Sequence, residues 1–334
     1  MGKSQKIAFW GGLAFVIIAG FVMVGTFLNQ ESDRARRSVK IAVSQTPLSA
    51  PFLIAQNNKL FQKQGIDVSL IPCFGGVACA KSLFDGQVDF ATASESVVMF
   101  QSFKHDDIRL IASFVESDND LKLLALKNQN IHSIQDLYGK RVGVIKASAS
   151  EFYLDSILIA NNVTDMAYTK VYLPPQELMN SLLSYQLDAI SIWEPYGYKT
   201  TISSASDVTN LGLQGIYQLS FNLISRQQLI AELGDETHKV LSALDEAISW
   251  IQAHPEEARA IIARQLDVPA NQLKWSWDDY VFRLSLGNAL LTNLQLQARW
   301  AIEKQLVPNQ QPDYRSIFAS KPFEDALDIK VKTR

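Results

Sequence analysis

The chain has 334 residues, 47% hydrophobic and 19% charged, a composition typical of globular proteins that excludes disorder as the main state. Its 31 Lys and Arg residues against 34 Asp and Glu residues give a formal net charge of −3, so the chain lacks the positive excess that nucleic-acid binding requires. Two cysteines, Cys73 and Cys79, are too few for a four-cysteine zinc site or a disulfide framework.

The N-terminal segment contains a run of 22 uncharged residues, 7–28, preceded by Lys3 and Lys6. This length is enough to cross the hydrocarbon core of a bilayer. The run ends in 25–29 (Gly-Thr-Phe-Leu-Asn), which offers no good signal-peptidase site, and no cysteine near it could carry a lipid. The run therefore predicts an uncleaved transmembrane helix, and a long signal peptide that is removed is the alternative.

With that anchor, we expect residues 1–6 to form a cytoplasmic stub, 7–28 to cross the membrane and 29–38 to form a linker. Arginines at 34, 36 and 37 compete with the N-terminal lysines under the positive-inside rule, so the charges alone do not decide the orientation. The short stub favours a folded domain outside the cytoplasm, beginning near Val39.

From Val39 onward, short β-branched runs alternate with amphipathic stretches, such as 52–64 and 151–161, that predict helices. This alternation indicates an α/β fold with mainly parallel sheets and helices on both faces. Ligands of such sheets bind beyond the carboxyl ends of the strands. The expected strands are 39–43, 68–71, 88–91, 108–114, 121–126, 141–145, 169–172, 189–192 and 221–225.

The C-terminal third changes character and predicts helices. Leu241, Leu244, Ile248 and Ile251 recur at helical spacing, and a second apolar stripe begins at Leu290. We interpret these stripes as packing surfaces rather than as parts of a site.

A pair of glycines follows the second expected strand. Gly75 and Gly76 lead into a helix, so their backbone amides could approach a bound group and the helix N-terminus would favour its electron-rich atoms. A tight strand-to-helix turn explains the same pair. Cys73 and Cys79 flank them and could close a small disulfide that stiffens this loop in an oxidising compartment.

Two further loops follow expected strands and carry hydroxyl groups. Ser94 and Glu95 come after 88–91, and Ser148 and Ser150 come after 141–145. Helix capping alone explains a serine at 148 or 150. Because three such loops could converge on one cleft, we predict that they contribute to one site.

The segment Trp193-Glu194-Pro195-Tyr196 directly follows the strand 189–192. An aromatic ring followed by an acid can stack on a flat ligand and accept its N–H groups. A buried Trp that closes a core beside a surface Glu is the alternative interpretation.

Enzymatic motifs are poorly represented. The four histidines are scattered without metal-ligand spacing, and no nucleophile elbow, phosphate loop or dinucleotide fingerprint occurs. We therefore expect no metal, no cofactor and no catalysis.

Together these features resemble the periplasmic solute-binding proteins of the nitrate/sulfonate/taurine/thiamine-precursor ABC importers. The resemblance covers nearly everything after Val39, and its pieces follow one another in the same order. The segments that carry it are 50–55, 60–68, 86–91, 136–144, 173–178, 187–189, 193–196 and 254–259.

The resemblance implies a type II periplasmic-binding-protein fold. In this fold, two α/β lobes are joined by crossing strands and close on a ligand by rotating about a hinge. Lobe 1 would comprise 39–126 with 221–320, and lobe 2 would comprise 127–220. The implied ligand contacts are Gln45, Thr46, Gly75, Gly76, Ser94, Glu95, Ser148, Ser150, Trp193 and Glu194.

The expected ligand is a small organic molecule: an aminopyrimidine, an amine, a zwitterion or a sulfonate-like compound. Glu95 and Glu194 favour N–H or cationic groups, and Lys146 is the one cation near these positions. The expected partner is an ABC permease or, in a receptor, a membrane sensor protein. Related enzymes rely on a cysteine that the loop 44–48 lacks, so an enzyme is the least favoured reading.

Overall fold

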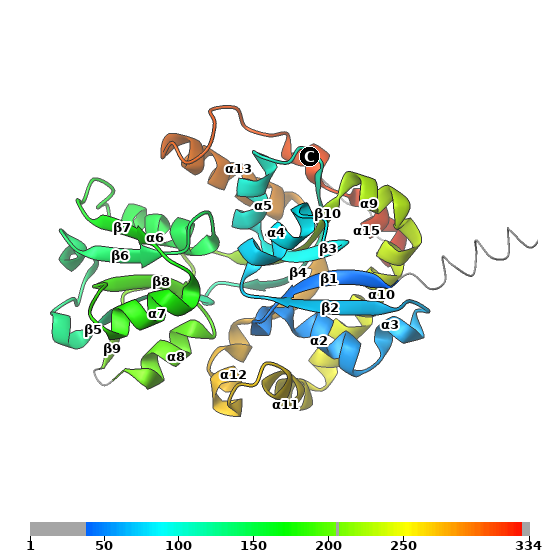
Figure 1. Cartoon of the computed structure of the whole chain (residues 1–334), viewed down its shortest axis with the longest axis horizontal. Coiled ribbons are helices and arrows are strands. Elements are labelled where there is room, and N and C mark those ends of the chain that lie inside the picture. Colours follow the sequence, from blue (N-terminus) through cyan, green and yellow to red (C-terminus); the bar gives the residue numbers. More distant parts are fainter. Residues whose placement is uncertain (1–37, 205–206, 329–334) are drawn as a thin grey trace, which may run out of the picture.

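The computed structural model describes residues 38–204 and 207–328 (Figure 1). The expected transmembrane segment, 7–28, lies outside the described residues. Among the residues that are described, no helix combines the length and the apolar character needed to cross a membrane.

The first sheet has six strands in the order β11-β4-β10-β3-β1-β2. Strands β1, β2 and β3 run parallel, and β10 is antiparallel to both β3 and β4. Its strands are β1 (Val39–Ser44), β2 (Val68–Cys73), β3 (Phe90–Ser94), β4 (Ile108–Ser117), β10 (Leu219–Arg226) and β11 (Val281–Ser285).

The second sheet has five strands in the order β7-β6-β8-β5-β9 and forms the lobe on the left of Figure 1. Strands β6, β7 and β8 run parallel, whereas β5 is antiparallel to both β8 and β9. Its strands are β5 (Leu121–Leu126), β6 (Arg141–Val144), β7 (Thr169–Tyr172), β8 (Ala189–Trp193) and β9 (Val208–Asn210).

Two segments connect the sheets: 118–120, between β4 and β5, and 211–218, between β9 and β10. We call them the crossing segments. The expected lobe boundary at residue 126 is wrong, because β5 pairs with β8 and β9 of the second sheet. The apolar run 121–126 predicts a strand but carries no information about which sheet it joins.

Helices cover both sheets, and the C-terminal helices pack on the first one (Figure 1). The predicted helix 52–64 is split, because Lys59 adopts a left-handed conformation with φ 56°. The α-helices are α2 (Ala50–Asn57), α3 (Leu60–Lys63), α4 (Gly76–Phe84), α5 (Glu95–Ser102), α6 (Ala149–Ala160), α7 (Pro175–Leu183), α8 (Tyr196–Ser203), α9 (Gln227–Glu232), α10 (Gly234–Ala253), α11 (Pro255–Gln265), α12 (Ala270–Ser276), α13 (Asn288–Glu303), α14 (Tyr314–Ile317) and α15 (Ser320–Leu327). The short 3₁₀ helices are Pro47–Ser49, Lys127–Gln129, Ile134–Leu137 and Trp277–Asp279.

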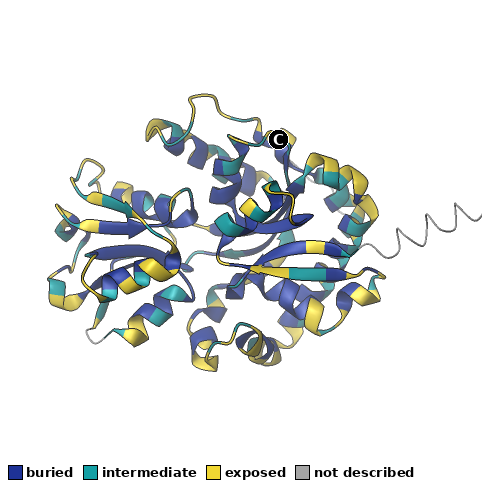
Figure 2. Cartoon of the chain, viewed as in Figure 1, coloured by how far each residue is buried: buried dark blue, intermediate teal, exposed yellow. Residues whose placement is uncertain are grey.

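The core of each lobe lies between its sheet and its helices (Figure 2). Strands β3, β5 and β8 are buried along their whole length, as expected for strands covered on both faces. The strands that sequence patterns missed, β9 and β11, are short edge strands. Arg283 interrupts β11, and Thr209 and Asn210 make up most of β9, so neither edge strand is a continuous apolar run.

Candidate ligand-binding site

A small cavity lies between the two lobes, at the carboxyl ends of strands from both sheets. Its volume is about 20 Å³, enough for about one water molecule. Six of the ten expected contact residues line it: Thr46, Gly75, Gly76, Ser94, Ser148 and Trp193.

The indole of Trp193 closes the cavity from lobe 2 and contacts Gly75 of lobe 1. A Cβ on Gly75 would lie 2.9 Å from Trp193 Cζ2, and one on Gly76 would lie 3.0 Å from Ala93 Cα. The paired glycines therefore permit two close approaches within the protein, one between the lobes and one between α4 and β3. Trp193 itself is only 9% exposed.

Three helices begin at the cavity: α4 and α5 from lobe 1 and α6 from lobe 2. Ser94 caps α5, where its side chain accepts a hydrogen bond from the amide of Val97. Ser148 caps α6 in the same way through the amide of Ser150. Because helix N-termini carry a partial positive charge, the cavity favours the electron-rich atoms of a ligand on this side.

Three buried oxygen atoms of cavity-lining residues have no hydrogen-bond partner among the described residues. They are Ser44 Oγ, Thr46 Oγ1 and Asp120 Oδ2. Buried polar atoms are nearly always hydrogen-bonded in native proteins, and an unpaired one costs about 1–3 kcal/mol. A ligand that pairs with these atoms would relieve that cost.

Asp120 lies in the first crossing segment and is 1% exposed. Its Oδ1 accepts a hydrogen bond from the Tyr280 hydroxyl at 2.8 Å. Burial raises the pKa of Asp120 to about 7, and the neighbouring Glu194 carboxylate adds to the rise. Sequence patterns missed this residue because the incorrect lobe boundary placed it inside lobe 1. A polar run at 116–120 between two apolar strands was the signal that could have found it.

Glu95 does not line the cavity, although the sequence interpretation placed it among the ligand contacts. Its carboxylate turns into lobe 1 and is completely buried. It accepts hydrogen bonds from the Ser220 amide at 2.8 Å, from Gln297 Nε2 at 3.0 Å and from the Tyr217 hydroxyl. Burial raises the pKa of Glu95 to about 7 despite these donors.

The remaining expected contacts, Gln45, Ser150 and Glu194, also lie outside the cavity lining. Glu194 Oε2 accepts from the Tyr198 amide at 2.9 Å, and burial raises the pKa of this carboxyl. Ser150 donates to the Ser191 carbonyl at 2.7 Å and so links α6 to β8. Glu95 and Glu194, on which the predicted ligand preference was based, therefore lie outside the cavity lining and bond to groups of the protein.

No Lys or Arg is present among the described residues that line the cavity. Lys146 lies over the ring of Tyr172, 5.5 Å from its centroid. Lys122 is buried beside Asp120, but its Nζ donates to the side-chain oxygen of Asn119 at 2.8 Å. An anionic ligand group would thus meet backbone amides and hydroxyls rather than a cationic side chain.

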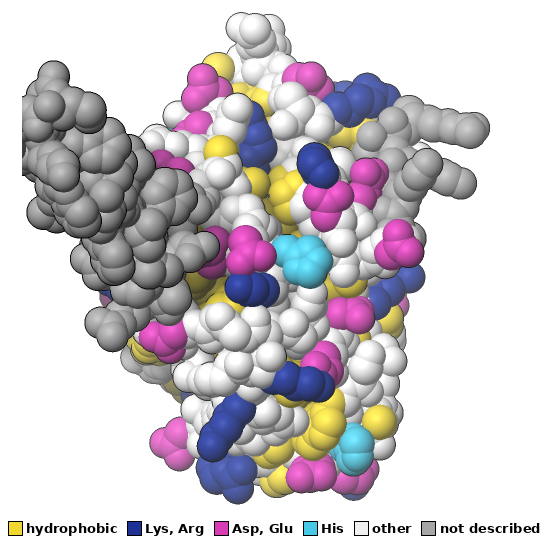
Figure 3. All heavy atoms as spheres, turned by 90° about the vertical axis from the view of Figure 1, so that its right-hand side faces the viewer, with side chains coloured by type: hydrophobic (Ala, Val, Ile, Leu, Met, Phe, Trp, Pro, Cys, Tyr) yellow, Lys and Arg dark blue, Asp and Glu magenta, His cyan; other side chains and the backbone are white. Residues whose placement is uncertain are grey.

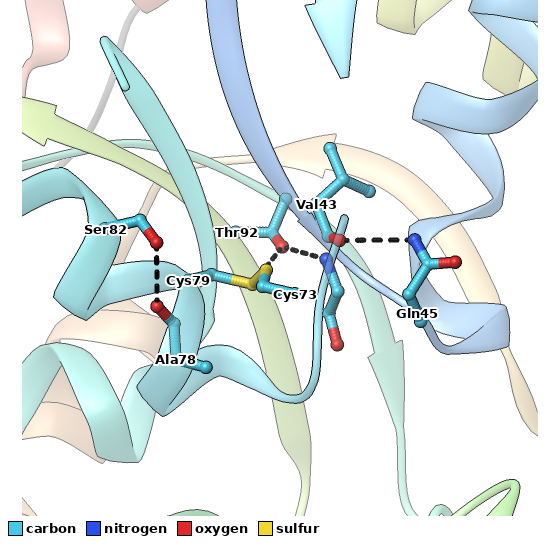
Figure 4. Close-up of a disulfide and its surroundings, with 8 residues drawn as sticks. Val43, Gln45, Cys73, Ala78, Cys79, Ser82 and Thr92 are labelled. Atoms are coloured by element: carbon cyan, nitrogen blue, oxygen red, sulfur yellow. Dashed lines mark hydrogen bonds between the residues drawn. A yellow bond between two sulfur atoms is a disulfide. The ribbon is translucent and has the colours of Figure 1, made fainter. Parts of the chain in front are cut away.

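Cys73 and Cys79 form a disulfide, the pairing that the sequence allowed (Figure 4). It links the end of β2 to the first turn of α4, and its Cα atoms are 5.4 Å apart, within the usual range. The bridge encloses Gly75 and Gly76, so it constrains the loop that contacts Trp193.

Metal-binding and nucleic-acid-binding sites have less support than a small-molecule site in the described residues. No cluster of three or more potential metal ligands occurs among the described residues. On the face shown in Figure 3, basic and acidic side chains are interspersed rather than gathered into a basic stripe.

The fold and the site define a two-lobed α/β protein with its cavity between the lobes. The family profile described as NMT1/THI5 like matches residues 46–258, more than half of the chain. The chain belongs to this family, which confirms the resemblance seen in the sequence.

Related proteins align over most of the chain. A Bacillus subtilis protein named "Putative aliphatic sulfonates-binding protein" is 25% identical over 324 residues, 96% of this chain and 93% of its own. A Haemophilus influenzae protein named "Putative thiamine biosynthesis protein" is 24% identical and covers 78% of this chain and 85% of its own.

Solved structures share the fold. The alkanesulfonate-binding protein SsuA from Xanthomonas axonopodis pv. citri, bound to MOPS, has a TM-score of 0.76 at 16% identity and covers 84% of this chain and 97% of its own. The periplasmic nitrate-binding protein NrtA from Synechocystis PCC 6803 has a TM-score of 0.68 at 13% identity and covers 87% of this chain and 88% of its own.

Proposed function

We propose that this protein is the solute-binding component of an ABC importer and captures a small organic molecule between its two lobes. The observation that carries the proposal is the inter-lobe cavity, where three helix N-termini and three unpaired buried oxygens surround one space. This is an arrangement for binding rather than for catalysis. Both cysteines of the chain are joined in the disulfide, so no thiol nucleophile is present.

The relatives support a small organic ligand. One is named for aliphatic sulfonates and another for thiamine biosynthesis, so the proposed ligands are a sulfonate-like compound, an amine or an aminopyrimidine. The cavity combines helix N-termini with a carboxyl group, and none of the described residues that line it carries a cationic side chain. A nitrate-like ligand that lacks any N–H donor fits this lining less well.

Ligand capture requires the lobes to move. Ligand sites usually enclose about 300–1,000 Å³, whereas this cavity encloses about 20 Å³. The described arrangement is therefore closed, and a ligand enters when the lobes separate about the crossing segments. The closed form would then be the one that a permease recognises.

The disulfide favours a location outside the cytoplasm, because such bonds persist in oxidising compartments. We propose that the domain faces the periplasm and that residues 7–28 tether it to the inner membrane. This tether would hold the domain near its permease. Western blotting of membrane and periplasmic fractions tests it, and a processed soluble protein in the periplasmic fraction would contradict it.

A ligand screen tests the binding function. The purified full chain is titrated calorimetrically with alkanesulfonates, amines, aminopyrimidines and nitrate, and small-angle X-ray scattering follows its radius of gyration. We expect saturable 1:1 binding of one organic class and a smaller radius with ligand. Binding of nitrate alone would contradict the organic ligand, and absence of binding throughout would contradict the function.

A further inference from the structure

We propose that Trp275 is a latch for the closed form: its indole, carried by lobe 1, holds lobe 2 through the ring of Tyr198 and so prolongs the retention of a captured ligand. This inference rests on the proposed binding function and adds a positioning residue that does not touch the ligand. It depends on three observations: the exposure of Trp275, the contact that it makes across the lobes, and the bonds that hold both partners.

Trp275 is not a core residue of lobe 1. Its helix, α12, packs on α11 and buries Leu273 and Ser276, whereas Trp275 is 57% exposed. Neither Trp275 nor Tyr198 belongs to the apolar core that the described residues form. Tyr198 is nevertheless only 8% exposed. Contacts outside the core therefore cover Tyr198, and the indole of Trp275 supplies one of them.

The rings of Trp275 and Tyr198 meet across the two lobes. Tyr198 lies in α8, which follows β8 of the second sheet, whereas α12 packs on α11 of lobe 1. The ring centroids are 6.0 Å apart, and the ring planes are inclined by 57°. Aromatic pairs at such distances contribute about two- to tenfold to an equilibrium constant. The contact therefore favours the closed form by a factor of that size.

This contact lies away from a second contact between the lobes. In Figure 1, α8 and α12 lie along the lower edge of the molecule, whereas α6 and α13 lie along its upper edge. At the upper edge, Trp300 of α13 donates to Asp155 of α6 at 3.0 Å. A movement of the lobes that preserves this hydrogen bond separates α8 from α12. The latch is thus placed where opening displaces the lobes most.

Hydrogen bonds to the first crossing segment hold the lobe 1 side of the latch. Asp279, three residues after α12, accepts from Asn119 Nδ2 at 2.8 Å, and the Tyr280 hydroxyl donates to Asp120 at 2.8 Å. These bonds fix the chain directly after α12 and thereby the helix that carries Trp275.

On lobe 2, the latch is connected to the wall of the cavity. The Tyr198 amide donates to Glu194 Oε2 at 2.9 Å, and Glu194 directly follows Trp193, which lines the cavity. Burial raises the pKa of Glu194, and the Trp275 side chain is among the groups that oppose the rise. The indole thus favours the ionised carboxylate, as an N–H turned toward it would. Because Trp275 lies outside the cavity lining, it can hold the closed form without contacting the ligand.

The first test measures how fast a bound probe leaves the full chain. The probes are ethanesulfonate, ethylamine, 4-aminopyrimidine and nitrate, and stopped-flow dilution gives their dissociation rates. We expect Trp275→Ala to raise this rate about two- to tenfold, by the same factor for every probe that binds, and Trp275→Phe to restore part of the difference. Trp250→Ala is the matched control, because it removes an indole that stacks on His254 within lobe 1, with ring centroids 4.8 Å apart. It should leave the rate unchanged.

A distance measurement tests the latch without any probe. Nitroxide labels on Thr201→Cys in α8 and Glu257→Cys in α11 report the separation of the lobes by electron paramagnetic resonance. Both native residues are exposed, and the two native cysteines are joined in the disulfide. We expect Trp275→Ala to lower the ratio of short to long distances about two- to tenfold. Tyr198→Leu should act similarly and add nothing to Trp275→Ala, because each substitution removes the same contact.

The outcomes separate the latch from the binding function. A dissociation rate in Trp275→Ala no faster than in Trp250→Ala, an effect confined to one probe, or additive effects of Trp275→Ala and Tyr198→Leu would overturn the latch and leave the binding function intact. Absence of binding for every probe would contradict the proposed function, and the distance measurement would still decide the latch. A wild type that shows only the long distance, with and without the probes, would overturn the latch.

Discussion

The contact between Gly75 and Trp193 can be tested by adding a single methyl group. Gly75 has φ 84° and ψ 159°, a region that only glycine adopts readily. A Cβ there would lie 2.9 Å from Trp193 Cζ2, closer than such atoms approach in real structures. Gly75→Ala should therefore strain the loop and also push the indole away from lobe 1.

The two effects have separate magnitudes. The backbone strain should lower the free energy of unfolding by about 1–3 kcal/mol. Displacement of Trp193 should make closure less favourable by about 1–2 kcal/mol, which weakens ligand binding by roughly 5–30-fold. Urea denaturation measures the first effect, and calorimetric titration with the tightest ligand of the screen measures the second.

Gly65 provides a matched control. It has φ +72°, but a Cβ there would meet nothing within 4 Å. Gly65→Ala should thus cost about 1–2 kcal/mol of stability through its left-handed backbone and leave the affinity unchanged. If Gly75→Ala binds ligand as tightly as Gly65→Ala does, the contact between Gly75 and Trp193 plays no part in closure and the reasoning is refuted.

Three further changes test the site and its surroundings. Trp193→Ala should weaken binding of a flat ring by about 1–3 kcal/mol in titration, and an unchanged affinity would remove the indole from the site. Replacing Cys73 and Cys79 by Ser should lower stability in urea by about 2 kcal/mol, the loop-entropy value for so short a closed loop; an unchanged midpoint would contradict this. Because the folded pKa of Glu95 lies near 7, above its unfolded value, its stabilising contribution is full below pH 4.5 and is lost as pH rises through 7. Between pH 5 and pH 8 this loss amounts to on the order of 3 kcal/mol of unfolding free energy. Glu95→Gln should therefore flatten the decline in stability over that range, measured by urea denaturation at each pH, and an unaltered slope would count against burial as the cause.

Strands β5 and β8 could be predicted from sequence because both of their faces are covered, so each appears as a short, largely apolar run. Strand β8 is fully buried, and its expected range differs from the structure only at the last residue, Trp193. The edge strand β9 could not be predicted, because three partly exposed residues between β5 and solvent carry no such pattern. Sheet membership is decided by tertiary contacts, which explains the misplaced boundary at β5.

The site was predictable to the extent that local chemistry determines it. Ser94 and Ser148 cap helices, and caps have a sequence signature. The direction in which a side chain at a helix start points has no such sequence signature. Glu95 follows its cap by one residue, yet donors from β10 and α13, distant in sequence, draw its carboxylate away from the cavity. Asp120 reaches the cavity only because the chain crosses between lobes there.

A buried hydrogen bond between Trp300 and Asp155 joins the two lobes. Trp300 Nε1 of α13, in lobe 1, donates to Asp155 Oδ2 of α6, in lobe 2, at 3.0 Å, and both side chains are more than 90% buried. Breaking this bond would leave buried polar atoms unpaired, at a cost of about 1–3 kcal/mol. Phe152 of α6 also packs against Tyr217 of the second crossing segment, with ring centroids 5.2 Å apart. Since α6 begins at the cavity and makes these contacts further along, a rotation of lobe 2 about the region of Trp300 would open the cavity without breaking them. We therefore propose that the hinge axis passes close to α6 and the second crossing segment, so that opening separates Trp193 from Gly75 and Tyr198 from Trp275.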